Sequence, residues 1–516
     1  MEQYRACELT YQGSVLTDHW AQIDLTAVFS CKDQQVTVRG FYDGTGVYKV
    51  RFLPMAAGVW QYQVSGVITD AGTLEVLPAA PGADHSPVYA EGCHFRRRSG
   101  ALFWPFGTTV YALAHQEDAL VRQTLESLKA SPFNKVRMCI FPKHYDYNHN
   151  EPPLYAFEKT VDGRWDVNRP DPAFWQRLER ILAELDQAGI QADLILFHPY
   201  DRWGFAQLSA QENRIYLDTV LRRLSAFPNV WWSLANEYDL CAAKTAQDWC
   251  DIEAFMASHD PAHHLLSCHN CFAFWDHSRP AVTHASLQTK MLARISEWRD
   301  QYQKPIVVDE CCYEGDLDQF WGSISGREMT NRFWRVVTTG GYCTHGETFL
   351  DPEEVLWWAR GGVLRGESPA RIAFLRGIVE SLPGPIDPLD LPVSPLFRMA
   401  ARQDRSALEQ MLAVAPEQFR HALKAVYQLG GEATFFAASE AVYMGHCGED
   451  AYLVFYDLRT CTKSWLELPE NHRYRVELID TWNMTRTELL PAASGKTQLT
   501  LPGREGMAVL AVRIDG

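Results

Sequence analysis

The strongest constraint on the fold is a repeated alternation of apolar and amphipathic segments through the middle of the chain. Eight apolar runs of strand length recur there: ALFWPFGTT, KVRMCIFP, QADLILFHPYD, NVWWSLANEYD, HLLSCHN, AVTHASLQ, PIVVDECC and GGYCTHGETF. Amphipathic stretches such as EDALVRQTLESLKA and PAFWQRLERILAELDQAG lie between many of them. Eight strands alternating with helices in roughly 320 residues are typical of a (β/α)8 barrel, an α/β fold whose functional groups lie at the C-terminal ends of the strands.

A doubly wound open sheet is the competing fold, since it produces a similar alternation. Such sheets often carry a G-x-G-x-x-G turn, which binds phosphate, where the first strand meets the first helix. The corresponding segment here, GTTVYALAH, has no such turn. We therefore predict a (β/α)8 TIM barrel over residues 89–425.

The two flanks of the chain show a different pattern. Residues 1–88 hold short runs of alternating polarity separated by turn residues, among them QQVTVRGFYDGTGVYKVRFLP with its DGTG turn. Residues 426–516 repeat this pattern in AYLVFYDL, RYRVELIDTW, KTQLTLP and MAVLAVRI. Alternation with period two, without a long helical period, predicts a small β-sandwich on each side of the barrel.

The composition narrows the classes of function. At 516 residues the chain is long enough for a large catalytic domain with smaller domains attached. Its formal net charge of −16, without a long Lys/Arg run, argues against a nucleic acid or an anionic membrane as partner. Aromatic residues make up 12% of the chain, and their rings can fill a core or stack on the apolar face of a sugar.

Signals for export, membrane insertion and metal binding are weak. The N-terminal sequence MEQYRACELTYQGSV lacks the apolar core of a signal peptide, and no run is long enough to cross a bilayer. Thirteen cysteines, an odd number, fit free thiols in a reducing compartment, so we expect a cytoplasmic protein. The CHNC at Cys268–Cys271 could be half of a zinc site. No second Cys pair lies at the usual spacing, so we expect no metal and no cofactor.

Acidic residues stand where two of the apolar runs end. The fourth run ends in Asn236 and Glu237, and the seventh in Asp309 and Glu310. A carboxylate at such a position is either a solvated charge or a group that moves protons in a cleft. In a barrel, Glu237 and Glu310 could approach each other over the mouth. Two carboxyls about 5 to 5.5 Å apart are what retaining glycoside hydrolysis needs.

An Asn-Glu on strand four together with a Glu on strand seven resembles the clan A glycoside hydrolases, which share the (β/α)8 barrel and a retaining mechanism. The segments FPKHYDYNHNEPPLYAFEK, VVDECCYEGD and IDTWNMTR are similar to bacterial members of this clan that carry an N-terminal and a C-terminal β-sandwich. The resemblance implies that Glu237 is the acid/base and Glu310 the nucleophile. It also implies that Asn236 hydrogen-bonds the 2-hydroxyl of the sugar.

Further residues are predicted to bind the substrate. Arg137, on strand two, is the candidate to keep Glu310 ionised, with a buried structural ion pair as the alternative. His198, at the end of strand three, is either a ligand of sugar hydroxyls or a core histidine. The other candidates lie near later strand ends or in the long loop after strand two, where they could instead hold the loop in place: Lys143, His144, Tyr145, Asp146, His284, His345 and Glu347. The clan often has a Tyr near the end of strand six and a Trp on strand eight, and neither ASLQ nor THGET supplies one.

The sequence thus predicts a retaining glycoside hydrolase. We expect exo action on short oligosaccharides or small glycosides, because the long loop after strand two should wall off part of the barrel mouth. A non-catalytic carbohydrate-binding or scaffold protein is one alternative. A metal-dependent barrel hydrolase is another, although the H-x-H usual on its first strand is missing from GTTVYALAH. The sequence has no readable code for the sugar or linkage, and it leaves a homo-oligomer open.

Overall fold

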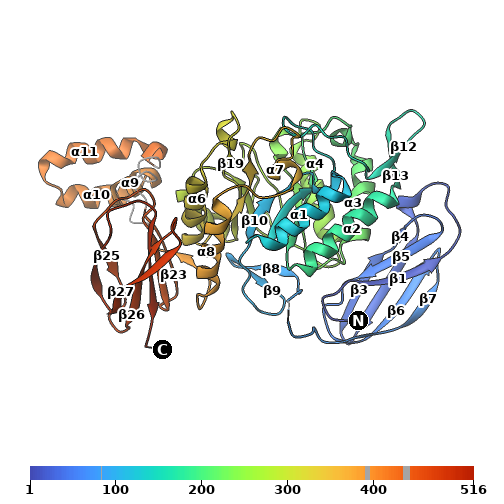
Figure 1. Cartoon of the computed structure of the whole chain (residues 1–516), viewed down its shortest axis with the longest axis horizontal. Coiled ribbons are helices and arrows are strands. Elements are labelled where there is room, and N and C mark those ends of the chain that lie inside the picture. The colour runs from blue at the N-terminus through green and yellow to red at the C-terminus, as the bar shows by residue number, and fades with distance from the viewer. Residues whose placement is uncertain (83, 390–394, 434–441, 516) are drawn as a thin grey trace. The chain divides into compact units, whose positions relative to one another are not determined.

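The computed structural model describes residues 1–82, 84–389, 395–433 and 442–515 (Figure 1). The chain divides into two compact units that interleave along the sequence. The first contains Met1–Gln288, Tyr302–Ser325 and Thr344–Pro369, and the second contains Thr289–Gln301, Gly326–Cys343 and Ala370–Gly516. Because the units interleave, they do not test the predicted domain limits at 88/89 and 425/426, which stay a prediction.

The N-terminal residues form two antiparallel sheets. One has the order β3-β2-β6-β7 and the other the order β1-β5-β4. Alternate side chains of β2 are buried, and they meet Phe52 and Trp60 in a shared core, as expected for two sheets packed face to face. The strands are β1 Cys7–Gln12, β2 Leu25–Cys31, β3 Gln34–Arg39, β4 Phe41–Tyr42, β5 Val47–Phe52, β6 Gly58–Gly66 and β7 Asp70–Val76, followed by the hairpin of β8 Val88–Glu91 and β9 His94–Arg97.

Eight parallel strands form the central sheet, in the order β16-β15-β14-β11-β10-β20-β18-β17. The two end strands, β16 and β17, meet through an isolated bridge between His269 and Ser286, so the sheet closes into a barrel. The strands are buried along almost their whole length, as in parallel sheets that are covered on both faces. Their bounds are β10 Phe106–Thr109, β11 Lys135–Cys139, β14 Gln191–Phe197, β15 Val230–Ala235, β16 Leu266–Ser267, β17 Ala285–Gln288, β18 Ile306–Glu310 and β20 Tyr342–His345. The predicted barrel is confirmed.

Helices follow the first four barrel strands. They are α1 Asp118–Ala130, α2 Pro172–Gln187, α3 Ala210–Leu224 and α4 Ala246–His259. Asp171 caps α2, and two capping boxes, Ser209 with Glu212 and Thr245 with Asp248, begin α3 and α4. Apolar residues from the four helices join those of the strands in one hydrophobic core.

Buried ion pairs connect the N-terminal domain to α2 and α3. Arg51 donates to Glu179 of α2 at 2.7 Å. Arg223 of α3 donates to the same Glu179 at 2.7 Å and to Asp43 at 2.6 Å. All four side chains are buried, so each charge depends on its partners for compensation.

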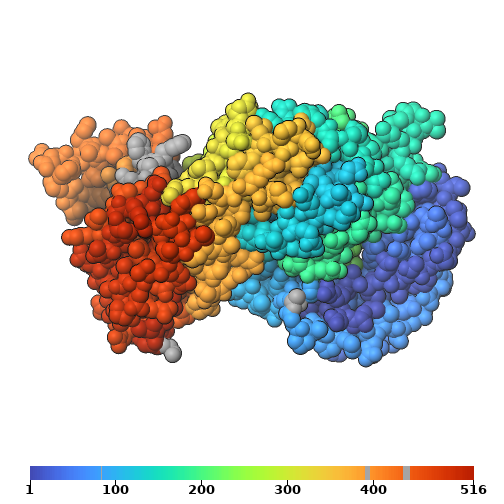
Figure 2. All heavy atoms as spheres, in the orientation of Figure 1, coloured from blue at the N-terminus to red at the C-terminus, as the bar shows by residue number. Residues whose placement is uncertain are grey.

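The connection after β11 is not the irregular loop that the sequence suggested. It contains a hairpin of β12 (Phe157–Lys159) and β13 (Trp165–Pro170). The tip of this hairpin projects from the surface (Figure 1, Figure 2). It therefore extends away from the strands that it connects.

The junction between β16 and β17, which we call the seam, lacks a covering helix of its own. Residues 268–284 connect the two strands, and the structure describes all of them without a helix. Asn270 Nδ2 donates to the carbonyl of Gln288 at 3.2 Å, and the Gln288 backbone N–H donates to Asn270 Oδ1 at 3.1 Å. These side-chain amide bonds supplement the isolated bridge and the hydrogen bonds between Leu266 and Thr283 at the seam.

Beyond β17 the chain forms four helices and a small accessory sheet before the C-terminal region. The helices are α5 Ile295–Tyr302, α6 Gly326–Thr338, α7 Trp357–Arg360 and α8 Ser368–Glu380. Two short strands, β19 (Glu314–Gly315) and β21 (Glu347–Thr348), pair in parallel just after β18 and β20.

The second unit ends in antiparallel strands. Six of them form a sheet with the order β22-β23-β24-β29-β26-β27, and β25 pairs with β28. Trp334 of α6 packs on Phe455 of β24, with ring centroids 5.6 Å apart. The strands are β22 Asp387–Pro388, β23 Tyr443–Cys447, β24 Ala451–Phe455, β25 Lys463–Glu467, β26 Tyr474–Asp480, β27 Thr485–Ala493, β28 Lys496–Thr500 and β29 Met507–Arg513.

Three further helices lie between β22 and β23 in the chain: α9 Pro395–Arg402, α10 Arg405–Val414 and α11 Glu417–Gln428. The sequence reasoning did not predict them. Among the described residues, no helix is both long and apolar enough to cross a membrane.

Candidate active site

Two glutamates stand at the C-terminal ends of barrel strands. Glu310 is the last residue of β18, and Glu237 follows β15 by two positions. The backbone of Glu237 has a φ of 52°, a left-handed conformation that residues with a Cβ rarely adopt and that is concentrated at functional sites. Only 5% of Glu237 and 9% of Glu310 is exposed. Both glutamates are therefore almost completely shielded from solvent.

Hydrogen bonds link the two carboxyls. The Tyr111 hydroxyl donates to Glu310 Oε1 and lies 3.0 Å from Asn236 Oδ1. Arg137 reaches the same two groups, with Nη1 3.4 Å from Glu310 Oε1 and Nη2 3.2 Å from Asn236 Oδ1. Asn236 Nδ2 in turn donates to Glu237 Oε2 at 3.2 Å. Asn236 thus lies between the two carboxyls: it donates to Glu237 and is connected to Glu310 through Tyr111 and Arg137.

The pKa of Glu237 is raised. Burial is the largest cause, followed by the negative charge of Glu310, while Lys143 and the Tyr200 hydroxyl oppose the shift. Tyr200 donates to Glu237 Oε2. With its amide nitrogen turned towards the carboxyl, Gln288 donates to Glu237 Oε1 at 3.1 Å. The site therefore favours a protonated Glu237 beside a second carboxyl.

A fully buried charge network lies next to Glu310. Lys135 Nζ is 2.6 Å from Asp309 and 2.9 Å from Asp193, and Arg137 Nε is 3.8 Å from both aspartates. Burial alone would raise the pKa of Asp309, but Lys135 and Arg137 outweigh it and hold that pKa well below its usual range. The sequence left two interpretations of Arg137 open, a partner of Glu310 or a member of a buried ion pair. Its position is compatible with both, since Arg137 contacts Glu310 and also belongs to the buried ion network.

Lys143 is surrounded by aromatic rings at the mouth of the barrel. Its Nζ lies 3.4 Å from the ring centroid of Tyr111, 4.4 Å from that of Tyr200 and 5.0 Å from that of Trp358. Burial lowers the pKa of Lys143. Tyr145 packs on Tyr200 and Trp358, so this residue and Lys143, both from the loop after β11, are brought to the two glutamates.

The CHNC segment contributes a histidine and a cysteine to the same region. His269 Nδ1 accepts the Glu237 backbone N–H at 3.4 Å, and its Nε2 lies 3.9 Å from Glu310. Burial, followed by the charge of Arg137, keeps the pKa of His269 well below its usual value, so the ring is neutral. Burial and the nearby Glu237 raise the pKa of Cys271 to about 12. In the described part of the chain, no group of three metal-binding side chains forms around this segment.

Two predicted ligands have their described contacts with groups other than the glutamates. His198 Nε2 is 3.2 Å from the carbonyl of Phe141, and burial lowers its pKa to about 3. His284 precedes the first residue of β17, so it lies at the opposite end of that strand from Gln288. It packs against the rings of Phe95 and Trp231.

The remaining predicted ligands are divided between the β11 loop and a second cluster. His144 is half-buried and Asp146 is exposed, and the His144 backbone N–H donates to the carbonyl of Tyr200 at 2.8 Å. His345 and Glu347 are fully buried and group with Glu314. The substrate contacts of all four predicted residues stay predictions.

Several residues of the site were not predicted from the sequence. Tyr111 and Tyr200 lie just after β10 and β14, and Gln288 is the last residue of β17. Trp358 belongs to α7, and Tyr313 follows β18, with its hydroxyl 3.4 Å from that of Tyr111. Except for Trp358, all of these are aromatic or amide residues at the end of a predicted strand or within a few positions after it, and this pattern could have identified them.

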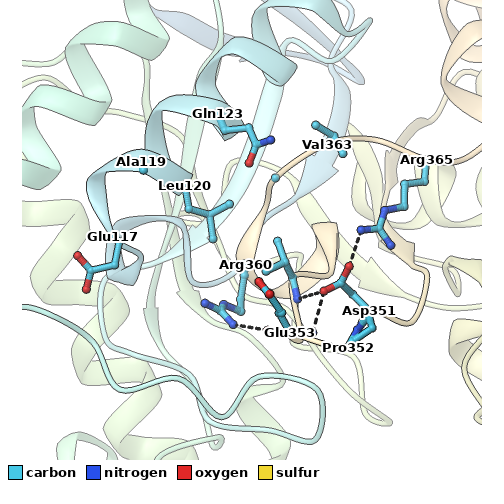
Figure 3. A pocket seen from close by; sticks show the side chains of 12 residues that line it. Glu117, Ala119, Leu120, Gln123, Asp351, Pro352, Glu353, Arg360, Val363 and Arg365 are labelled. Atoms are coloured by element: carbon cyan, nitrogen blue, oxygen red, sulfur yellow. Dashed lines mark hydrogen bonds and ion pairs between the residues drawn. The ribbon is translucent and has the colours of Figure 1, made fainter.

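A separate hollow of about 770 Å³ lies between α1 and residues 351–365 (Figure 3). Its charged lining groups are largely paired with one another, since Arg365 binds Asp351 at 2.6 Å and Arg360 donates to the carbonyl of Glu353 at 2.9 Å. None of the residues around Glu237 and Glu310 lines it. The hollow is therefore distinct from the group of residues around the two glutamates.

Comparison with protein families finds matches over most of the chain. Residues 90–351 match the family described as "Apiosidase-like, catalytic domain". Residues 1–66 match a domain of unknown function, DUF5060, and residues 440–514 match another, DUF5605. A comparison with curated proteins finds no match.

Solved structures support the same assignment. A crystal structure from Bacteroides vulgatus, described as a "putative glycoside hydrolase", is 33% identical over 99% of both chains with a TM-score of 0.85. A glycoside hydrolase family 5 structure from Bacteroides vulgatus is 14% identical, covers 83% of this chain and 93% of its own, and has a TM-score of 0.57. The second likeness concerns the fold alone.

Proposed function

Because the chain belongs to the apiosidase-like family of glycoside hydrolases, we propose that it works by double displacement, with Glu310 as nucleophile and Glu237 as acid/base. The observation that carries this proposal is the connection of the two buried carboxyls through Tyr111 and Asn236. Burial and the charge of Glu310 raise the pKa of Glu237, which keeps a proton available for the leaving group.

In the first step, a carboxylate oxygen of Glu310 attacks the anomeric carbon. The bond from that carbon to the departing oxygen breaks, and Glu237 gives its proton to this oxygen. Arg137 and Tyr111 both reach Glu310 Oε1, so they hold the carboxylate in position for the attack. In this mechanism Asn236, which contacts Glu237 and the Tyr111 hydroxyl, binds the 2-hydroxyl of the sugar.

In the second step, Glu237 changes its role. Formation of the glycosyl ester removes the charge of Glu310, and the pKa of Glu237 falls because that charge helped to raise it. Glu237 can then accept a proton from a water molecule whose oxygen attacks the anomeric carbon. The bond to Glu310 breaks, the sugar leaves with its original configuration, and both carboxyls return to their starting states.

The surroundings favour a pocket for one terminal sugar. Little of either glutamate is exposed, and Tyr145, Trp321 and Trp358 gather in one aromatic cluster beside Lys143. Aromatic rings suit the apolar face of a pyranose or furanose. We therefore infer exo action on short oligosaccharides or small glycosides.

The test of the nucleophile uses Glu310→Ala on a panel of aryl glycosides that includes an apioside. We expect kcat/KM to fall by about 10⁴-fold or more, since the covalent route is lost. Added azide should restore turnover and give a glycosyl azide of inverted configuration. Glu253→Gln, which changes a buried glutamate of α4, is the matched control and should keep its activity. Substantial residual activity of Glu310→Ala without azide rescue would refute the assignment.

A further inference from the structure

Two carboxylates and an imidazole converge in a buried group that the proposed mechanism does not use. Glu314, His345 and Glu347 are at most 2% exposed, and one ligand atom from each lies within 4.8 Å of the other two. The parallel pairing of β19 with β21 places Glu314 beside Glu347. The group therefore connects the segments that follow the seventh and eighth barrel strands.

No lysine or arginine side chain of the described residues balances the charge of this group. The two carboxylates accept backbone N–H groups of the 365–368 segment, at 2.7–3.1 Å. Glu347 Oε1 and His345 Nε2 have no hydrogen-bond partner in the described part of the chain. Two buried carboxylates with only backbone partners would be stabilised by a cation between them.

The spacing of these unpartnered atoms fits two ligands of one metal ion. Glu347 Oε1 and His345 Nε2 are 3.5 Å apart. A charge-assisted hydrogen bond would be about 2.8 Å long, whereas two ligands about 2.1 Å from a tetrahedral Zn²⁺ are about 3.4 Å apart. The other ring nitrogen of His345, Nδ1, lies 3.1 Å from Thr108 Oγ1. This hydroxyl can accept a hydrogen bond from Nδ1–H. In that tautomer Nε2 carries no proton and its lone pair can bind a metal.

Gly366 keeps the space before both carboxylates clear. A Cβ on this residue would lie 2.5 Å from Glu314 Oε2 and 2.6 Å from Glu347 Oε1. Two oxygens from different strands thus face the same small region, which a side chain at position 366 would fill.

We propose that Glu314, His345 and Glu347 bind one divalent transition-metal ion, with Zn²⁺ as the best match, and that this ion braces the segments after β18 and β20. A nitrogen ligand with two carboxylates suits Zn²⁺, whereas Ca²⁺ and Mg²⁺ prefer oxygen ligands. Glu314 completes the set by a small rotation of its side chain or through a water molecule. Because the group is buried, the ion enters as the chain folds, and the site is structural and separate from Glu237 and Glu310.

The test measures metal content and thermal stability of the full chain without an affinity tag. The protein is unfolded with a chelator, refolded with Zn²⁺, Mn²⁺, Ca²⁺ or chelator alone, and freed of loose metal. We expect about one Zn²⁺ per chain and a higher melting temperature in the zinc sample than in the chelator sample. Glu347→Gln and Gly366→Ala should lower the affinity for zinc by about tenfold or more. Glu253→Gln removes a buried carboxylate that pairs with Arg279 at 2.8 Å, and it should bind zinc like the wild type.

The two variants test different parts of the proposed metal site. Gly366→Ala tests the space, and Glu347→Gln keeps the volume of the side chain, so it remains informative if the former does not fold. Less than about a tenth of an equivalent of any metal in the refolded wild type, with no change of melting temperature, would overturn the proposal. A proton shared by Glu314 and Glu347 would then balance the charge, and Glu347→Gln would leave stability nearly unchanged.

Discussion

Replacement of Tyr200 by phenylalanine tests whether Glu237 is the general acid. The Tyr200 hydroxyl donates to Glu237 Oε2 and so stabilises the ionised carboxylate, which lowers the pKa of Glu237 against the effects of burial and Glu310. Tyr200→Phe removes this bond and should raise that pKa further. Since a general acid works only while it is protonated, activity that is lost as pH rises through the pKa of Glu237 should persist to higher pH in the variant.

The hydrogen bond sets the size of this shift. A hydrogen bond to a charged group contributes about 1.5 to 3 kcal/mol, and about 1.4 kcal/mol corresponds to one pKa unit. The alkaline limb of the pH profile should therefore move upward by about 1 to 2 units. At low pH, where Glu237 is protonated in both proteins, kcat/KM should change much less.

The assay is the pH dependence of kcat/KM for an aryl glycoside with a poor leaving group, because such a substrate needs protonation. Tyr216→Phe is the matched control, since it also removes a tyrosine hydroxyl, but one that is buried and donates to the carbonyl of Leu196 at 3.0 Å. It should lose stability without a shift of the alkaline limb. An unchanged or lowered limb in Tyr200→Phe, or the same shift in both variants, would refute the reasoning.

Three further outcomes are expected. Glu237→Ala should reduce kcat/KM far more for glycosides with poor leaving groups than for those with activated phenols, as measured on a series of aryl glycosides, and equal losses would contradict the acid role. Digestion of an oligosaccharide series should release single sugars from one end, whereas early internal fragments of many lengths would argue against a pocket. Arg223→Ala should lower the free energy of unfolding by about 3 to 5 kcal/mol in denaturant titrations, because Asp43 and Glu179 lose a buried partner. A change below about 1 kcal/mol would show that Arg51 and water compensate for the lost charge.

The barrel and its two glutamates could be predicted because their signals are local in the sequence. Buried parallel strands appear as continuous apolar runs, and Glu237 and Glu310 stand directly at the ends of two of them. The same approach misplaced His284 within its strand. AVTHASLQ contains both the histidine and the final Gln288, and an apolar run alone does not show where pairing begins.

Residues that meet only in three dimensions could not be predicted in this way. Glu314 pairs with Glu347 across two segments that lie far apart in the sequence, and neither segment has a periodic pattern. Trp358 comes from a short helix after the last barrel strand and reaches Lys143 through the fold. The sequence therefore indicated the positions of Glu237 and Glu310 better than the groups that surround them.

Because of the seam between β16 and β17, we expect the enzyme to lose activity on heating before the barrel unfolds. One isolated backbone bridge, the hydrogen bonds between Leu266 and Thr283 and a pair of amide bonds join the two strands, which form no continuous ladder with each other. Local opening should therefore start there at a lower free energy than global unfolding. His269 and Gln288 lie on the two sides of this junction, and both contact Glu237. Opening would remove the partners of the acid while most of the barrel remains folded. Gentle heating should consequently produce a reversible, inactive state in which amides of the seam exchange with solvent before those of β11 and β14.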